Sequence, residues 1–232
     1  ARKPILLASA GQYGARLSDV RRMVDARARR VIRKSAHQNI VQGEAYRSAS
    51  GMVGLQPEFP VFDADAPVAA LVARYKAAAR PLAEAGAGRL AAAASRMPQA
   101  NGESVMGRIV ADSILAATRD ASAGGAQLAF VNPGGVRADL LPAADGSVTY
   151  GQLFSVQPFG NTLMVMSLTG EQIRQALEQQ FDSGSNTVSA PRILQVSEGF
   201  SYRFDRSQPA GRRVSELRLN GRLLEMPQRY RV

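Results

Sequence analysis

Short stretches near the N-terminus alternate between apolar and polar residues. The alternation covers residues 16–20 and 30–33, and an apolar run covers residues 4–8. A repeat of two residues is the period of a β-strand, because successive side chains point to opposite faces. The pattern therefore predicts three short strands in this part of the chain.

A proline-rich stretch then interrupts the strand pattern. Three prolines occur between residues 56 and 67, which predicts a linker. Pro67 suits the first turn of a helix, where its missing N–H would have no partner. The helix would carry one apolar face, formed by Val68, Leu71, Val72 and Tyr75. We expect it to end or kink near Arg80, because Pro81 cannot donate a helical hydrogen bond.

From residue 86 onward, helical and strand patterns alternate, which predicts an α/β domain. Two helices are expected, over residues 103–118 and after Thr169, where a capping box precedes an apolar repeat. The expected strands cover residues 127–131, 161–168 and 200–204, followed by a hairpin over residues 215–224 with an Asn220–Gly221 type I′ turn.

The overall composition is that of a soluble globular protein. Of the 232 residues, 45% are hydrophobic. No apolar run approaches the ~20 residues that a membrane-spanning helix needs. The N-terminal apolar segment is too short for a signal peptide. We therefore expect no membrane span.

The chain is poor in metal-binding side chains. It contains no cysteine and one histidine, His37, so thiolate chemistry, disulfides and Cys-ligated zinc are excluded. Its 19 carboxylates show no clustered ligand spacing, and a dimetal hydrolase needs several converging ligands. We expect no metal site and no catalytic residue in these 232 residues, with His37 at the surface or packed.

The chain is strongly basic, with a net charge of +10 and a pI of about 10.7. The densest run of basic residues lies between Arg21 and Lys34. Basic proteins often bind nucleic acid, but no basic stripe here is interleaved with stacking aromatic residues. We expect no nucleic-acid partner and interpret the charge as attraction for small anionic substrates.

A glycine-containing motif between residues 129 and 137 has the chemistry of a phosphate site. A buried strand runs into backbone left bare by Gly134 and Gly135, and Arg137 follows as a cation. A guanidinium offers a planar set of donors that matches phosphate oxygens. The alternative is a loop arginine that pairs with Asp139 or is simply solvated.

A second motif, at residues 156–161, suits a nucleotide base. Phe159 lies between Pro158 and Gly160, which favour a rigid exposed loop over strand packing, and Asn161 adds an amide. An exposed ring can stack on a base, although a phenylalanine between strands is more often in the core. Phe154 lacks this context, and we expect it in the core.

These two motifs, together with residues 102–107 (Gly-Glu-Ser-Val-Met-Gly), occur in one order and at plausible spacing. In this combination the chain resembles the C-terminal domain of the 5′-nucleotidase family, over residues 67–232. That family includes bacterial UDP-sugar hydrolases and 2′,3′-cyclic-nucleotide phosphodiesterases. The resemblance implies a mixed-sheet α/β domain, preceded by remnant β-strands and an interdomain helix.

The resemblance also implies roles for individual residues. Arg137 would grip phosphate, Phe159 would hold the base, and Asn161 would contact the base edge. Asn132 would contact the nucleoside, and Gly135 would allow a close backbone approach. Arg96 would also bind the substrate, because many members of the family carry an arginine several residues before the Gly-Glu-Ser motif.

The implied organisation has three parts. Residues 1–55 would be the remnant of an N-terminal metallophosphatase domain, residues 56–85 a linker with the interdomain helix, and residues 86–232 a substrate domain shortened at its C-terminal end. Two divalent ions would bind the missing domain and none this fragment, which should be inactive alone. The full enzyme would be periplasmic or secreted. The alternative is a non-catalytic module that binds nucleotides or nucleotide sugars.

Overall fold

The computed structural model describes residues 8–10, 14–49 and 51–232. The chain divides into an N-terminal unit, residues 1–79, and a C-terminal unit, residues 80–232. The strand expected at residues 4–8 lies outside the described residues except for Ala8, which is in no strand. In the described part of the chain, no helix is both long and apolar enough to cross a membrane.

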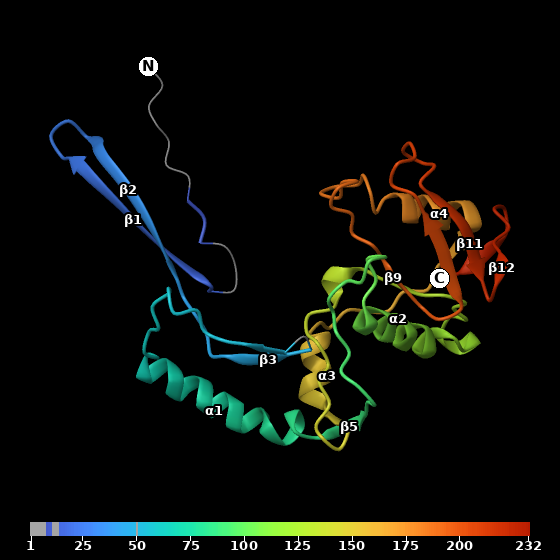
Figure 1. Cartoon of the computed structure of the whole chain (residues 1–232), viewed down its shortest axis with the longest axis horizontal. Helices are drawn as coiled ribbons and strands as arrows, with labels where there is room; N and C mark the ends of the chain where they lie inside the picture. The colour runs from blue at the N-terminus through green and yellow to red at the C-terminus, as the bar shows by residue number, and fades with distance from the viewer. Residues whose placement is uncertain (1–7, 11–13, 50) are drawn as a thin grey trace. The chain divides into compact units, whose positions relative to one another are not determined.

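The N-terminal unit is built from two antiparallel hairpins. The longer one pairs β1 (Arg16–Asp25) with β2 (Arg30–Ile40) and carries a bulge after Met23; Figure 1 shows it as a long two-stranded ribbon. The shorter one pairs β3 (Tyr46–Ser48) with β4 (Gly51–Val53). The strands expected around residues 16–20 and 30–33 are therefore confirmed. None of the residues described in this unit is buried.

Residues 54–65 form no helix or strand, and helix α1 (Ala66–Ala83) follows them. Pro67 lies in the first turn, as expected. The helix was expected to end or kink near Arg80, and it ends three residues later, at Ala83, with Pro81 inside it. A proline in the last turn removes only its own N–H from the ladder, and the amide of Glu84 still donates to the carbonyl of Arg80 at 2.9 Å.

The C-terminal unit mixes helices with small antiparallel sheets, which confirms the α/β class. Its sheets pair β5 with β7, β6 with β9, β8 with β13, and β11 with both β10 and β12. The helices are α2 (Val105–Thr118), α3 (Tyr150–Val156) and α4 (Gly170–Glu178). The strands are β5 (Gly86–Arg89), β6 (Phe130–Val131), β7 (Ser147–Thr149), β8 (Ser167–Thr169), β9 (Gln195–Val196), β10 (Phe200–Phe204), β11 (Val214–Leu219), β12 (Arg222–Leu223) and β13 (Arg229–Arg231).

Three apolar clusters hold this unit together, and two of them are large. The first gathers around Phe181 and joins α4 to the sheet of β10 and β11. The second packs the buried face of α2 against the segments that flank β6 and β7, through residues such as Met106, Val136 and Val156. The second core is the one that lies beneath the predicted nucleotide motifs.

Several sequence predictions for this unit are confirmed in detail. Helix α2 ends at Thr118 as expected, α4 begins with a capping box at Thr169, and residues 200–204 form the expected strand. The turn between β11 and β12 has positive φ at Asn220 (50°) and at Gly221 (79°), as a type I′ turn requires.

The expectation of a strand over residues 161–168 is largely wrong. Only β8 forms there, and Leu163 and Met164 are exposed. A strand needs a partner for its backbone groups, and β13 pairs only with β8, extended by the mutual bonds of Met166 and Val232 at 2.9 and 2.8 Å. The strand expected over residues 127–131 shrinks to β6, although Leu128 and Ala129 are buried as expected.

The start of α2 is fixed by one buried side chain, Gln195, which is 1% exposed. Its Oε1 accepts from the backbone N–H of Ser104 at 2.7 Å, and its Nε2 donates to the carbonyl of Ile193 at 2.9 Å. Gly107 has to be a glycine here, because a Cβ would overlap this amide. Gln195 therefore ties α2 to β9.

We predict that Gln195→Ala lowers the free energy of unfolding by about 2 kcal/mol, because it leaves the buried N–H of Ser104 without a partner. Urea unfolding followed by circular dichroism measures the change. Gln208→Ala removes an exposed amide that bonds Asp205 and is the control, expected to stay within about 0.5 kcal/mol of the parent protein. Equal stability of the Gln195 variant would contradict the assignment.

The first turn of α4 carries an ion pair with a pH signature. Arg174 and then Gln175 donate hydrogen bonds to Glu171, which lowers the pKa of Glu171 to about 2. A carboxyl whose folded-state pKa is depressed contributes stability above its unfolded pKa of about 4.3, and this contribution is lost as the pH falls through about 2.

We therefore predict that Glu171→Gln lowers the Tm at pH 6 and that its Tm deficit shrinks as the pH falls from about 4 to about 2. Thermal melts at several pH values test this. Glu44→Gln, at an exposed glutamate without a described ion pair, should show no such trend. A deficit that stays constant over this range would contradict the assignment.

Candidate functional site

The first predicted motif forms a tight turn after β6. The 3-10 turn Pro133–Gly135 follows Asn132, whose carbonyl accepts from the N–H of Gly135 at 2.9 Å. A side chain at Gly135 would press on Val131 and Asn132, with gaps of 3.3 and 3.2 Å from its Cβ. Val136 then enters the core at 4% exposure, so the turn is anchored and the side chains of Asn132 and Arg137 remain exposed.

The second predicted motif follows α3. This short helix begins with a capping box at Thr149 and ends at Val156, which is buried. Residues 157–166 then continue without helix or strand. Because Val156 is anchored in the same core as Val136, the chain leaves the core at a defined point just before Phe159.

The structure brings these two motifs together. The backbone N–H of Arg137 donates to the carbonyl of Val156 at 2.8 Å. The side-chain amide of Gln157 donates to the carbonyl of Gly135 at 3.4 Å. The glycine turn and the loop that carries Phe159 are therefore joined by direct hydrogen bonds.

Arg96 lies beside the same turn. Its backbone N–H donates to Oδ1 of Asp139 at 2.8 Å. The residues on either side reinforce this contact, because Ala94 and Leu140 exchange backbone bonds of 2.9 and 3.0 Å. The side chain of Arg96 is exposed, so two arginines, at positions 96 and 137, emerge from segments that are bonded to each other.

The guanidinium of Arg137 bends back over its own turn, where Nη1 donates to the carbonyl of Gly134 at 3.2 Å. Phe159 is 47% exposed, and Gly160 and Asn161 beside it are exposed as well. The ring therefore presents a face to solvent, as a stacking platform for a base requires.

Phe154 lies at the surface, contrary to the expectation from the sequence. It was expected in the core, but it is 53% exposed. Helix α3 buries Val156 alone, which leaves the Phe154 ring on the outer side. There it stacks on Tyr150, with ring centroids 6.3 Å apart.

A cavity that the motifs did not indicate lies next to Asn132. Its volume is about 400 Å³, and it lies between the turn at Asn132–Gly134 and the end of α4. Polar side chains reach it from Gln179, Ser183 and Arg192. No described hydrogen bond or ion pair engages the guanidinium of Arg192. No sequence signal could have found these residues, because they lie far along the chain and form no motif with Asn132.

Metal ligands do not gather in the described part of the chain. Among residues 8–10, 14–49 and 51–232, no group of three or more His, Asp or Glu side chains could hold a metal ion. His37 lies exposed on β2, paired in register with Asp19. The arrangement at the joined loops can bind through cations, amides and a ring, but it offers no metal centre.

The family profile described as "5′-nucleotidase, C-terminal domain" matches residues 82–232. This match covers more than half of the chain and agrees with the boundaries of the C-terminal unit. The chain therefore belongs to the 5′-nucleotidase C-terminal domain family.

Curated relatives agree with this assignment. The trifunctional nucleotide phosphoesterase protein YfkN of Bacillus subtilis is 38% identical over 118 residues, which cover 50% of this chain and 8% of YfkN. The NAD 5′-nucleotidase of Haemophilus influenzae is 34% identical over 122 residues, 50% of this chain and 20% of that protein. The chain thus aligns with only a small part of each relative.

The fold is also found in a solved structure. Sulfate thiohydrolase SoxB from Thermus thermophilus superposes with a TM-score of 0.54 at 18% identity, covering 94% of this chain and 36% of that one. At this identity the likeness shows the fold alone.

Proposed function

We propose that this chain supplies the nucleotide-binding part of a metal-dependent phosphohydrolase that cleaves phosphate esters of nucleotides. The observation that carries the proposal is the pair of hydrogen bonds that joins the Arg137 turn to the loop of Phe159. A cation for phosphate and an exposed ring for a base then belong to one site, in a domain of the 5′-nucleotidase family.

Each side chain has a distinct role in this proposal. The Phe159 ring stacks on the base, and the amide of Asn161 bonds its edge. Asn132 contacts the nucleoside, and the bare backbone at Gly135 admits the ligand closely. Arg137 binds phosphate, because the planar set of donors on its guanidinium matches the phosphate oxygens.

Two further features extend the site. Arg96 supplies a second cation next to Arg137, since its backbone is bonded to Asp139. The cavity beside Asn132 offers the amide of Gln179 and the guanidinium of Arg192. Both features suit a substrate that carries more polar groups than a single phosphate.

The family resemblance implies two divalent ions, and the residues of this chain do not fit them. With one histidine and no cysteine, and without a ligand cluster among the described residues, no step through a metal is assigned to this chain. In the proposal, a metallophosphatase domain holds the ions and activates water, and the enzyme acts outside the cytoplasm. This chain binds and orients the nucleotide, and alone it does not hydrolyse it.

We predict that Phe159→Ala weakens the binding of AMP by about tenfold, because base stacking on an aromatic ring contributes about 1–3 kcal/mol. Binding of ribose 5-phosphate, which has no base, should not change. Isothermal titration calorimetry of the 232-residue chain with both ligands measures this. Phe154→Ala removes an exposed ring outside the loop and is the matched control. Equal losses for both ligands, with a lowered Tm, would assign Phe159 to the fold instead of the site.

We predict the opposite selectivity for Arg137→Ala. Loss of a charge-assisted hydrogen bond should weaken the binding of AMP by about tenfold, because such bonds contribute about 1.5–3 kcal/mol. Adenosine, which lacks the phosphate, should bind as before. Arg137→Lys should recover part of the affinity, and Arg212→Ala, at an exposed arginine elsewhere in the unit, should change nothing. If the substitution weakened the binding of adenosine as much as that of AMP, Arg137 would not be the residue that binds phosphate.

A further inference from the structure

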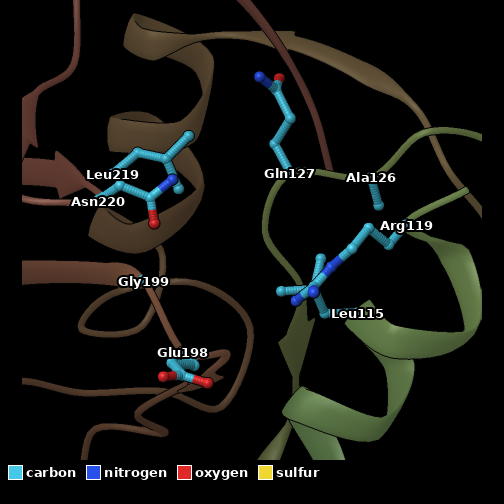
Figure 2. A pocket seen from close by; sticks show the side chains of 8 residues that line it. All are labelled: Leu115, Arg119, Ala126, Gln127, Glu198, Gly199, Leu219 and Asn220. Carbon is cyan, nitrogen blue, oxygen red and sulfur yellow. The ribbon is translucent and has the colours of Figure 1, made fainter.

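A second cavity lies in the C-terminal unit and shares no residue with the proposed nucleotide site. It has a volume of about 560 Å³, within the range of small-molecule sites. Four segments surround it: the end of α2, residues 126–127 before β6, the turn between β9 and β10, and the turn between β11 and β12 (Figure 2). The proposed function gives this cavity no role.

The walls of this cavity are held by hydrogen bonds that backbone amides donate. The N–H of Glu198 donates to Oδ1 of Asp112 at 2.6 Å, which ties this turn to α2. The N–H of Asn220 donates to the carbonyl of Gly199 at 2.7 Å, which joins the two turns. Gly199 has a φ of 83°, and a Cβ there would overlap the Asn220 side chain. The polar groups of the cavity are therefore presented from fixed backbone.

The cavity carries one cation and one anion on different walls. Arg119 follows the last residue of α2, and its guanidinium extends toward the side where Glu198 and Asn220 lie (Figure 2). No described hydrogen bond or ion pair engages the side chains of these three residues. Arg119 and Glu198 thus do not neutralise each other, and each can bind a ligand group of opposite charge.

The remaining surface is apolar or amide in character. Leu115, Ala126 and Leu219 supply the apolar part of the lining. The amide of Asn220 adds a neutral donor and acceptor. A ligand that matches this lining carries a carboxylate, an ammonium group and an aliphatic portion.

A neighbouring cavity of about 460 Å³ shares Gln127, Leu219 and Asn220 with the first. It repeats the mixed charge, because Arg222 and Glu225 line it. A ligand longer than one amino acid can therefore extend from the first cavity into the second and meet the same kinds of group.

From this geometry we infer that the cavity between Arg119 and Glu198 binds a small zwitterion, either an aliphatic α-amino acid or a short peptide with free termini. Arg119 receives the carboxylate, Glu198 receives the ammonium group, and the aliphatic portion covers Leu219. This site is independent of the nucleotide site and does not rest on its assignment.

The test measures binding to the 232-residue chain by isothermal titration calorimetry with L-leucine and with L-leucyl-L-leucine. Two analogues each lack one charge: 4-methylpentanoate has no ammonium group, and 3-methylbutylamine has no carboxylate. Each analogue should bind about tenfold more weakly than leucine, because it loses one charge-assisted contact. Tighter binding of the dipeptide identifies a peptide as the occupant, and tighter binding of leucine identifies a free amino acid.

Matched variants assign the two charges. Arg119→Gln should weaken the binding of leucine about tenfold and leave the binding of 3-methylbutylamine unchanged. Glu198→Gln should weaken the binding of leucine and leave the binding of 4-methylpentanoate unchanged. Arg212→Gln, outside the cavity, should have no effect, and circular dichroism checks that each variant is folded. The inference is overturned if neither leucine nor the dipeptide binds saturably, or if the analogues and variants bind equally well.

Discussion

The candidate nucleotide site depends on one backbone hydrogen bond, from the N–H of Arg137 to the carbonyl of Val156. The bond is held in place because Val136, which precedes the donor Arg137, and Val156, the acceptor residue, are both buried in the core beside α2. That core keeps the two loops in register while the side chains proposed to face a ligand stay exposed. An apolar core thus sets the positions of the polar groups to which the proposal assigns ligand binding.

The parts of the fold that could be predicted from sequence are those governed by local rules. The capping box at Thr169 and the Asn220–Gly221 turn involve residues a few positions apart, and both were found as expected. The strand expected at residues 161–168 depended on a distant partner, and its apolar pattern alone could not show that β13 reaches only β8 and Met166. Phe154 was misplaced for a similar reason, because the buried face of a two-turn helix is set by what packs against it.

The candidate site likewise contains residues that local sequence could indicate and residues that depend on distant segments. The motifs could propose Arg137 and Phe159 because glycine and proline flank them in the sequence. They could not indicate Arg192 or Arg119, whose significance comes only from the cavities into which distant segments bring them. The C-terminal unit therefore carries polar cavities of different chemistry on one scaffold, and the nucleotide motifs did not indicate them.

The central claim, that the joined loops form a nucleotide site, is tested most directly by titrating the isotope-labelled chain with AMP and mapping the backbone amide shifts by NMR. The account predicts that the largest shifts fall at residues 132–137 and 159–161, with smaller shifts at Arg96 and Arg192. Residues that line the Arg119 cavity should not shift. Saturable shifts confined to other segments, or no shifts at all, would contradict the account.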